Sequence, residues 1–212
     1  MPIQLSINIG ETVGQTYITE KLLAAGKTSN VFVARSKLNT EAKRVALKVY
    51  PIDIEQSTLN NDIAVLQSIG GKTHFSNCLE QGTYRKFSYL ALELLGPTLS
   101  DIMKRPQMKK LNLSSVVKVG IQGLEALSIL HSAGFVHGQV CMENFAIGYT
   151  QETAGNLYLI DFTGSKRIDD ESLNKGNKTN EDRLSTKIRL VQNDLQCLMK
   201  MMMTLYRGGE EV

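Results

Sequence analysis

The sequence predicts an α+β fold in two lobes, with strands in the first part of the chain and helices in the second. Three early segments alternate apolar and polar side chains in the manner of strands: YITEKLLA, NVFVARS and RVALKVYP. From about residue 99 onward the apolar residues instead recur at helical spacing. A length of 212 residues is enough for one large domain or two small lobes.

The second expected helix carries the clearest pattern. It covers residues 113–134, with Ser114 as a candidate N-cap and Gly134 as its end. The apolar residues at helical spacing are Val117, Ile121, Leu124 and either Leu127 or Ile129. The other expected elements are a helix at 55–68, strands at 87–96, 145–147 and 157–160, and a helix at 194–206. The polar stretch 163–190 is expected to be a long mobile loop.

Composition places the chain among ordinary globular proteins. It is 42% hydrophobic and 21% charged, with a formal net charge of +3. The basic residues are scattered, so no nucleic-acid or membrane partner is expected. No apolar run is expected to reach the roughly 20 residues of a membrane span, because the richest run, residues 195–206, is short and contains Lys200.

The cysteines indicate a reducing compartment. Cys78, Cys141 and Cys197 are far apart and odd in number, without metal-ligand spacing. Reduced thiols in a cytoplasmic or nuclear protein fit best. The first fifteen residues lack the basic and apolar regions of a signal peptide, which agrees with that location.

Five segments in chain order resemble parts of one protein family. VALK (45–48) is similar to the protein-kinase strand whose lysine grips nucleotide phosphates, and ELLGPTLSDI (93–102) is similar to the hinge of the casein kinase I family. FVHGQVCMENFAI (135–147) has the outline of the catalytic loop, and LYLIDFTGS (157–165) that of the turn with a metal-binding aspartate. NDLQCLMKMMMTLYRG (193–208) resembles the central helix of the helical lobe. Five segments in this order are a specific signal.

The resemblance covers residues 17–208 and points to the casein kinase I group. DIAVLQSIGGKTH (62–74) resembles the tau-tubulin kinase branch, and the His-Gly pair after Val136 resembles the vaccinia-related kinases. The fold implied is a single bilobal protein-kinase-like domain over 1–212. Its parts would be a β-rich N-lobe at about 1–93, a hinge at about 93–98, and a mainly helical, shortened C-lobe at about 99–212.

The catalytic loop departs from the family pattern at its reactive positions. Gln139 stands where the family has its catalytic aspartate, and a neutral amide is a very poor base. Loss of a general base commonly costs roughly 10²–10⁴ in rate. Cys141 replaces the lysine that steadies the transferring phosphate, and Gly138 replaces the arginine. A structural cysteine is the stronger interpretation of Cys141, with a nucleophile as the alternative.

The nucleotide-binding parts implied by the resemblance are partly retained. Of the three glycines of the phosphate loop only Gly26 remains, with Ala24 and Ser29 at the other places. That pattern fits either a weakened phosphate grip or a plain β-hairpin. Lys48 is retained, and its partner is expected to be Asp62, or Asn61 if the register slips. The other positions that match the family's nucleotide site are Val31, Ala46, Leu92 at the gatekeeper place, Glu93, Leu95 and Ala146.

The metal-binding pattern is the best preserved. Asn144 and Asp161 match the two positions that hold Mg²⁺ in the family. Thr163 takes the place of the glycine that follows this aspartate and Phe162. His137 and Phe162 are expected to pack in the hydrophobic spine, as His and Phe do in the family. ATP and Mg²⁺ are therefore possible, weakly bound cofactors.

The end of the sequence leaves an apolar helix without its family partners. The segment between Phe162 and Asp194 is shorter than the family's activation segment, and further helices of the C-lobe would follow residue 208 in the family. The helix residues left to be covered are Leu195, Leu198, Met199, Met202, Met203 and Leu205. A fragment, a shortened isoform, or a protein partner over 194–206 would each account for this.

Three functions follow from these residues. The favoured one is a pseudokinase, a catalytically impaired binding, scaffold or regulatory module that weakly binds ATP. The second is an enzyme: a residual Ser/Thr kinase that uses water or another carboxylate, or a protein that uses the nucleotide for a different transfer. The carboxylates nearby in sequence are Glu143, Asp169 and Asp170. The third is a structural interaction module without nucleotide.

Overall fold

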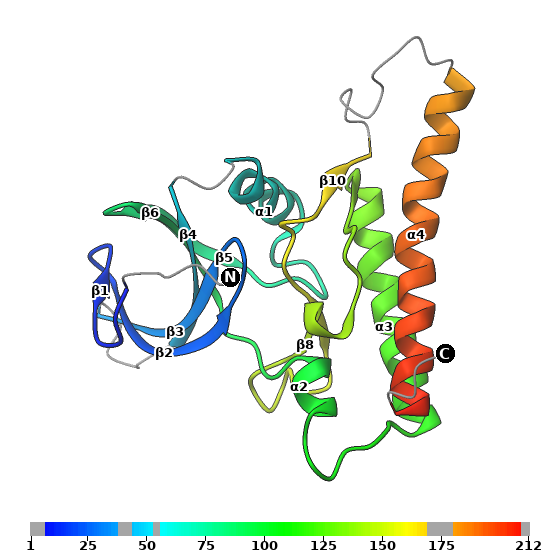
Figure 1. The fold of residues 1–212 in the computed structure, drawn as a ribbon, viewed down its shortest axis with the longest axis horizontal. Coiled ribbons are helices and arrows are strands. Elements are labelled where there is room, and N and C mark those ends of the chain that lie inside the picture. The colour runs from blue at the N-terminus through cyan, green and yellow to red at the C-terminus, as the bar shows by residue number, and fades with distance from the viewer. Residues whose placement is uncertain (1–6, 38–43, 53–55, 169–179, 209–212) are drawn as a thin grey trace. The chain divides into compact units, whose positions relative to one another are not determined.

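The computed structural model has the predicted α+β architecture and divides into two compact units (Figure 1). Unit 1 comprises residues 1–70 and 76–95, and unit 2 comprises residues 71–75 and 96–212. The structure describes residues 7–37, 44–52, 56–168 and 180–208.

Unit 1 contains a curled antiparallel sheet in the strand order β1-β2-β3-β4-β6-β5. Its strands are β1 (Thr12–Val13), β2 (Tyr17–Ala25), β3 (Asn30–Ser36), β4 (Arg44–Pro51), β5 (Cys78–Tyr84) and β6 (Phe87–Glu93). The three alternating segments of the sequence form β2, β3 and β4, as predicted. The strand expected at 87–96 ends at Glu93, and β5 was not predicted because its apolar and polar residues do not alternate clearly.

One face of this sheet forms the core of unit 1. The alternation in β3 and β4 sends every second side chain to that face. The buried members of the core are Ile7, Val13, Tyr17, Phe32, Ala34, Val45, Leu47, Val49, Tyr89 and Ala91. The rings of Tyr17 and Tyr89 meet edge to face with centroids 6.3 Å apart. The buried cluster therefore lies on one face of the sheet, and the side chains between its members point to the opposite face.

Helix α1 (Gln56–Ile69) lies within one residue of its predicted bounds. The chain leaves the helix at Gly70, whose N–H donates to the carbonyl of Leu66, and turns at Gly71 with φ +76°. The Gly-Gly pair ends the helix because glycine adopts this left-handed conformation without steric cost.

The short segment 71–75 groups with unit 2, although the sequence places it inside the N-lobe. His74 is buried and has a φ of +72°, which is rare for a side chain other than glycine. Its Nδ1 lies 2.7 Å from the carbonyl oxygen of Leu157, and its Nε2 lies 3.1 Å from Glu125 Oε2. These bonds to residues far along the chain fix the segment to unit 2.

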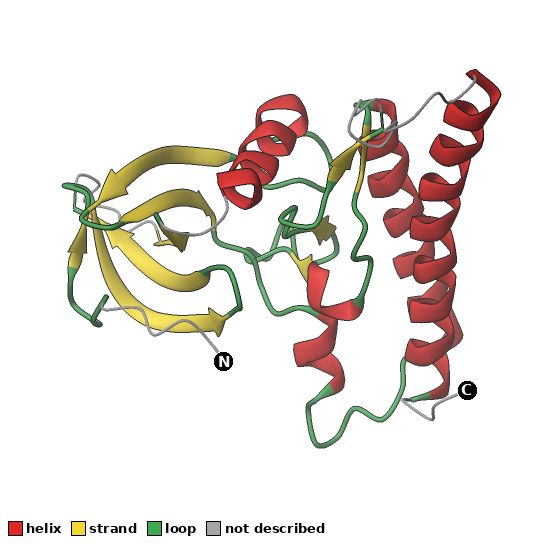
Figure 2. Ribbon diagram, turned by 45° about the horizontal axis from the view of Figure 1, so that its top comes forward, coloured by secondary structure: helices red, strands yellow, loops and turns green. Residues whose placement is uncertain are grey.

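Unit 2 is mainly helical, with two small two-stranded sheets, β7 with β10 and β8 with β9 (Figure 2). Its elements are α2 (Leu99–Met103), α3 (Leu113–Ser132), β7 (Phe135–Val136), the 3-10 helix η1 (Met142–Asn144), β8 (Phe145–Ile147), β9 (Leu157–Leu159), β10 (Lys166–Arg167) and α4 (Asn180–Arg207). The strands expected near 145–147 and 157–160 are present as β8 and β9. Helix α2 begins at a capping box formed by Thr98 and Asp101.

Helix α3 begins at a different cap from the predicted one. Asn112 is the N-cap, and its Oδ1 accepts a hydrogen bond from the N–H of Ser115 at 2.8 Å. Ser114 lies inside the helix, because the asparagine two residues earlier already satisfies an open N–H of the first turn. Gly134 follows the C-cap with φ +85°, as the predicted helix end requires.

The predicted apolar face of α3 is mostly on the surface. Val117, Ile121 and Leu124 are 45%, 54% and 52% exposed. Gly120 and Gly123 lie against Met202 and Leu198 of α4. The buried residues of α3 are Val116, Gly120, Gly123, Ala126, Leu127 and Leu130. Apolar spacing identified the helix, and Leu127 of that set is buried, but the spacing did not identify the rest of the buried face, because close helix packing selects small residues as well as large apolar ones.

Helix α4 is longer than predicted. The expected mobile loop over 163–190 holds β10 and the first turns of α4, which begins at Asn180 and not at 194. Leu184, Ile188 and Val191 recur at helical spacing in this stretch, but the polar residues between them hide the pattern. The first turn carries Glu181 and Asp182, which favour a helix N-terminus.

By length and composition, α3 also meets the criterion for a candidate membrane span. No such segment was expected from the sequence, because the richest apolar run, residues 195–206, is short and contains Lys200. One helix of this kind is weak evidence, since the core helix of a soluble protein passes the same test. In the structure α3 packs along α4, and just before α3 the N–H of Leu111 donates to the carbonyl of Leu205 in α4 at 2.9 Å.

The glycine contacts between α3 and α4 predict the effect of a larger side chain. A Cβ added at Gly123 would lie 2.8 Å from Cδ1 of Leu198. Gly123→Val should therefore lower the free energy of unfolding by about 1–3 kcal/mol through overpacking. Gly155→Val is the matched control, because nothing lies within 4 Å of a Cβ at Gly155. Equal urea midpoints for the two variants would contradict the packing shown here.

Candidate functional site

The buried carboxylate of Asp194 organises the segment that resembles a catalytic loop. Asp194 is 1% exposed and lies in α4. Its Oδ2 accepts a hydrogen bond from the N–H of His137 at 2.8 Å, and its Oδ1 accepts one from the N–H of Gly138 at 2.9 Å. The Nε2 of His131, at the end of α3, lies 2.9 Å from Oδ2. One side chain thus joins α3, α4 and the loop.

The hydrogen bonds also decide the charge of Asp194. Burial alone would raise the pKa of this carboxyl, but the bonds from His131 and from the N–H groups of His137 and Gly138 hold the pKa below its usual value. Asp194 is therefore ionised at neutral pH and accepts from three donors.

Gln139 occupies the predicted base position, directly after this anchor. Its side chain is exposed and lies against Gly164, where an added Cβ would come within 2.8 Å of the Gln139 Cδ. The backbone carbonyl oxygen of Gln139 accepts a hydrogen bond from Asn144 Nδ2 at 2.9 Å. The preceding residue, Gly138, has φ +76°. The loop therefore keeps an ordered backbone, while the side-chain amide of Gln139 cannot act as a base.

Cys141 and Glu143 face each other on the far side of the loop. Burial raises the pKa of the Cys141 thiol, and a hydrogen bond with Glu143 raises it further. Because the thiolate is the nucleophile, this environment argues against a nucleophilic Cys141. Oε1 of Glu143 accepts a hydrogen bond from Ser100 Oγ at 3.0 Å, so this carboxylate is held toward α2. Asp169 and Asp170, the other carboxylates considered, lie outside the described residues.

The two predicted metal ligands lie on neighbouring segments. The N–H of Ile160, just before Asp161, donates to the backbone carbonyl of Asn144 at 2.9 Å. Asp161 has a φ of +66°, a conformation that costs free energy and is often found at functional sites. Thr163 Oγ1 donates to Asp161 Oδ1 at 2.9 Å. The positive φ falls on Asp161, so the glycine missing at position 163 is not needed for this turn.

Amide and carboxylate oxygens suit Mg²⁺, and two protein ligands are typical because Mg²⁺ keeps several waters. Asn144 and Asp161 therefore fit a magnesium ion by their chemistry. In the part of the chain that the structure describes, no group of three or more His, Cys, Asp or Glu residues could hold a metal. A tight structural metal site is thus not formed by these described residues.

His137 and Phe162 pack together, as the spine resemblance implies. Their ring centroids are 5.6 Å apart at 69°, and Phe162 also contacts Phe75 with centroids 6.1 Å apart. All three side chains are buried. The N–H of His137 in turn donates to Asp194, so the three packed rings are connected to the carboxylate that holds the loop.

In unit 1, Lys48 forms a buried ion pair with Asp62, the first of the two alternatives left open by the sequence. Lys48 Nζ lies 2.8 Å from Asp62 Oδ2, and the side chains are 8% and 3% exposed. The hydroxyl of Tyr50 donates to the same oxygen. Burial raises the pKa of Tyr50 well above its usual value, so the phenol stays a donor. Asp62 thus has two donors from β4.

The segment at the predicted phosphate loop forms a tight hairpin between β2 and β3. The N–H of Gly26 donates to the carbonyl of Ser29 at 2.9 Å, and a Cβ at Gly26 would lie 2.7 Å from that oxygen. Gly26 is therefore required by the turn itself. Its N–H already has an acceptor, which leaves fewer free backbone donors for phosphate.

The strand register collects four of the predicted nucleotide residues on one face of the sheet. Val31 pairs with Lys48, and Ala46 pairs with Leu92. Paired residues and residues two apart share a face, so these four lie opposite the core cluster. Glu93 points to the other face, where its carboxylate accepts from the N–H and Nδ2 of Asn77 at 3.0 Å.

The remaining two predicted residues lie elsewhere. Leu95 follows β6 outside any strand and is half-buried, and Ala146 lies in β8 of unit 2, where it pairs with Tyr158. Ala146 is buried and also bridges to Thr98. These two positions are therefore not on the sheet face that carries Lys48.

Sequence reasoning missed Tyr50 and His131. Tyr50 lies two residues after Lys48 on the same strand face, so the period of two could have identified it as a partner of Asp62. His131 donates to Asp194 across 63 positions of sequence, and no local pattern signals such a contact.

Comparison with known proteins defines the class of fold. A crystal structure of a kinase domain superposes with a TM-score of 0.78 over 96% of this chain and 68% of its own, at 16% sequence identity. The chain therefore has a protein kinase-like fold. No family model matches the sequence.

Relatives in sequence carry kinase names. A probable serine/threonine-protein kinase of Dictyostelium discoideum is 29% identical over 165 residues, which are 76% of this chain and 33% of that protein. A Caenorhabditis elegans protein named as a candidate casein kinase I is 24% identical over 195 residues, or 87% of this chain and 57% of that protein. The chain thus spans between a third and about three fifths of these relatives.

The anchor can be tested by removing its charge. Asp194→Asn replaces an acceptor of three donors with an amide that has one acceptor oxygen, so we expect a loss of at least about 3 kcal/mol in unfolding free energy at pH 7. Because the folded pKa lies below 3.8, the difference should persist above that pH and vanish as the pH falls through the lowered pKa. Urea titrations at several pH values measure this. Asp101→Asn, at an exposed cap, is the control.

Tyr50, the second of the two donors from β4 to Asp62, gives another test. Tyr50→Phe removes the hydroxyl and leaves Asp62 short of one hydrogen bond, so we expect a loss of about 1.5–3 kcal/mol. Tyr84→Phe is the matched control, since Tyr84 bonds the carboxylate of Glu11 at 3.0 Å without being buried. It should change stability by no more than about 0.5 kcal/mol. Equal losses in the two variants would show that burial does not strengthen the Tyr50 bond.

Proposed function

We propose that this chain is a catalytically impaired, protein kinase-like module that binds other proteins and retains weak affinity for ATP with Mg²⁺. The observation that carries the proposal is Gln139 on a loop whose backbone is held by Asp194. The frame of the loop is retained, while the side chain that should accept the proton of the substrate hydroxyl is an amide.

The neighbours of Gln139 support the loss of phosphotransfer. Cys141 supplies no positive charge where the family has a lysine, and its thiol is held protonated by burial and by Glu143. Glu143 is engaged by Ser100 and is directed toward α2. Neither residue takes over the role of the missing base or of the missing cation.

The retained residues support weak nucleotide binding. Lys48 is ordered by Asp62 in unit 1, and Asn144 and Asp161 offer oxygen ligands for Mg²⁺ in unit 2. The affinity for nucleotide is weak because, in the hairpin between β2 and β3, the N–H of Gly26 already donates to the carbonyl of Ser29. Nucleotide bound in this way would order the module without reacting rapidly.

Thermal unfolding with and without ATP, each with and without Mg²⁺, tests the binding part. A ligand at 100 times its Kd stabilises the native state by about 2.7 kcal/mol. We expect a rise in Tm with ATP that depends on Mg²⁺ and is lost in Asp161→Asn. No rise at millimolar ATP would contradict nucleotide binding and would favour the interaction module without nucleotide.

A residual Ser/Thr kinase is the second candidate, favoured by the ordered Lys48–Asp62 pair. Gln139→Asp distinguishes it from the main proposal. Restoration of a carboxylate should raise phosphotransfer by roughly 10²–10⁴ if the base is the single defect. We expect a much smaller rise, because Cys141 and Gly138 also depart from the family pattern. Substantial phosphotransfer by the unmodified chain would overturn the proposed impairment.

A further inference from the structure

A stripe of apolar side chains runs along the exposed side of α4. Leu184 and Ile188 in its first half are 58% and 47% exposed. Met199, Met203 and Tyr206 in its second half are 64%, 44% and 50% exposed. At about 100° per residue these five side chains fall within an arc of about 100°, so they lie on one side of the helix, in two groups separated by the turns between Ile188 and Met199. We call this face the α4 stripe.

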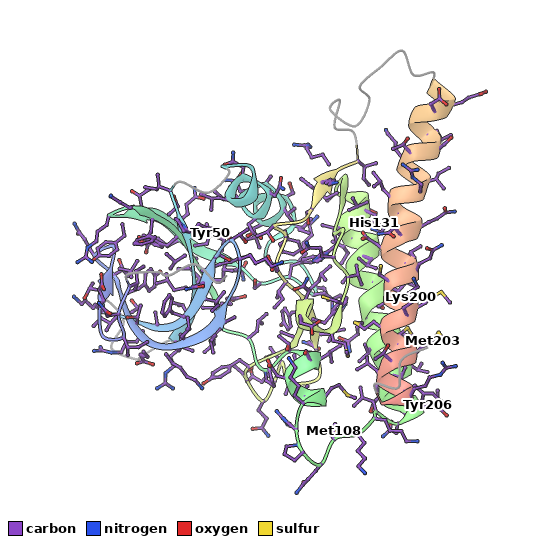
Figure 3. The ribbon with its side chains drawn as sticks, in the orientation of Figure 1. Tyr50, Met108, His131, Lys200, Met203 and Tyr206 are labelled. Carbon is purple, nitrogen blue, oxygen red and sulfur yellow. The ribbon has the colours of Figure 1, made fainter. Side chains whose placement is uncertain are left out.

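The α4 stripe is separate from the face that holds α4 to the rest of unit 2. The packed face carries the buried residues Asp194, Leu198, Met201 and Leu205. Figure 3 shows Met203 and Tyr206 on the outer side of α4, away from α3. Covering the stripe would therefore leave the contact between the two helices intact.

The first half of α4 extends beyond α3. Helix α3 ends at Ser132, and His131 lies level with Asp194 through their contact at 2.9 Å. Asn180 lies fourteen positions before Asp194, about 21 Å further along the helix. Figures 1 and 2 show these first turns reaching past the end of α3. Leu184 and Ile188 lie on this extension.

The spacing of the stripe is symmetric about the centre of the helix. Leu184 and Met203 are equally far from the point between Asn193 and Asp194, and Ile188 and Met199 are equally far from it as well. The same point is the midpoint of α4, which runs over Asn180–Arg207. Two copies of α4 placed antiparallel with these midpoints together would bring Ile188 of each copy opposite Met199 of the other, while Leu184 and Met203, about 100° apart around the helix, would lie level with each other at opposite edges of the contact.

We propose that the α4 stripe is a docking surface for a second copy of this chain, which binds through its own α4 in the antiparallel direction. The helices are 28 residues long, or about 42 Å, and would be in contact over that whole length. An isologous contact of this kind closes on itself and gives a dimer. The pairing buries Ile188 and Met199 at the centre of the contact and places Leu184 and Met203 at its edges and Tyr206 near the end of the opposite helix.

Charge at the two ends of α4 fits the antiparallel direction. Glu181 and Asp182 lie in the first turn, and Arg207 lies in the last. Antiparallel pairing brings the acidic turn of each copy beside Arg207 of the second copy, and it also places opposite helix dipole ends together. Arg189 and Lys200 of the two copies come near each other on one flank, so moderate salt should strengthen the dimer slightly.

Helix α3 provides a matched control surface. Leu113, Val117, Ile121 and Leu124 are 62%, 45%, 54% and 52% exposed, and they form a second apolar face of similar size. Replacing Ile121 with a charged residue removes about as much exposed apolar surface as the same replacement at Ile188. Non-specific association would respond to both changes, whereas the proposed dimer depends on α4 alone.

The test measures molar mass by size-exclusion chromatography with light scattering, from about 1 to 100 μM protein. The unmodified chain should approach twice its 23.5 kDa mass. Ile188→Lys and Met199→Glu should each weaken dimerisation at least about tenfold, and Ile121→Lys should leave it unchanged. Circular dichroism with thermal unfolding confirms that each variant is folded.

The double variant Ile188→Lys with Met199→Glu fixes the register. The two positions are eleven residues apart in one helix, about 16 Å, so they do not meet within a copy. In the antiparallel dimer each new lysine faces a new glutamate, and dimerisation should recover to within about threefold of the unmodified chain. A monomer at 100 μM, a dimer lost equally with Ile121→Lys, or failure of the double variant to recover would each overturn the proposal.

Discussion

The helical unit depends on one buried negative charge, the carboxylate of Asp194. A buried charge is tolerated only when hydrogen bonds replace its lost hydration, and here His131 and two backbone N–H groups provide them. The donors come from α3 and from the loop that follows β7, while the acceptor comes from α4. Satisfying this single charge therefore fixes three segments at once. The left-handed backbone of Gly138 is one consequence, since it directs that N–H toward the carboxylate.

Unit 1 repeats the same principle with a pair of opposite charges. Lys48 and Asp62 join β4 to α1, and Tyr50 supplies a second donor to the carboxylate. Aspartate is one methylene shorter than the glutamate of the family pattern, and the phenol from the same strand adds a bond on the same oxygen. The ion pair is thus built into the interior of its unit, where loss of either partner would leave an unpaired charge.

The anchor in unit 2 is compatible with the proposed loss of phosphotransfer, because it holds the loop by its backbone. Asp194 binds the backbone of His137 and Gly138, and it makes no demand on the side chain of Gln139. The hydrogen bonds of Asp194 therefore do not depend on which side chains stand at positions 139 and 141. The proposed impairment of phosphotransfer is a change of chemistry on a preserved frame, which leaves surfaces such as the α4 stripe available for binding.

Local pattern was enough to locate β2, β3 and β4, because alternation with a period of two is a property of each strand by itself. It also located α1, α3 and the pair of Lys48 with Asp62, where the family resemblance added the partner. The local pattern did not locate the start of α4, because polar residues separate Leu184 from Ile188.

The sequence by itself determined which residues are apolar, which are charged, and which side chains stand at the positions that resemble the kinase pattern. Only the tertiary structure decided which apolar faces are covered: Gly120 and Gly123 admit α4, and Ile121 stays exposed. It likewise decided that His74 belongs to unit 2 and that His131 bonds Asp194. The reason is physical, because burial and long-range hydrogen bonds depend on neighbours that are distant in sequence and leave no local periodicity.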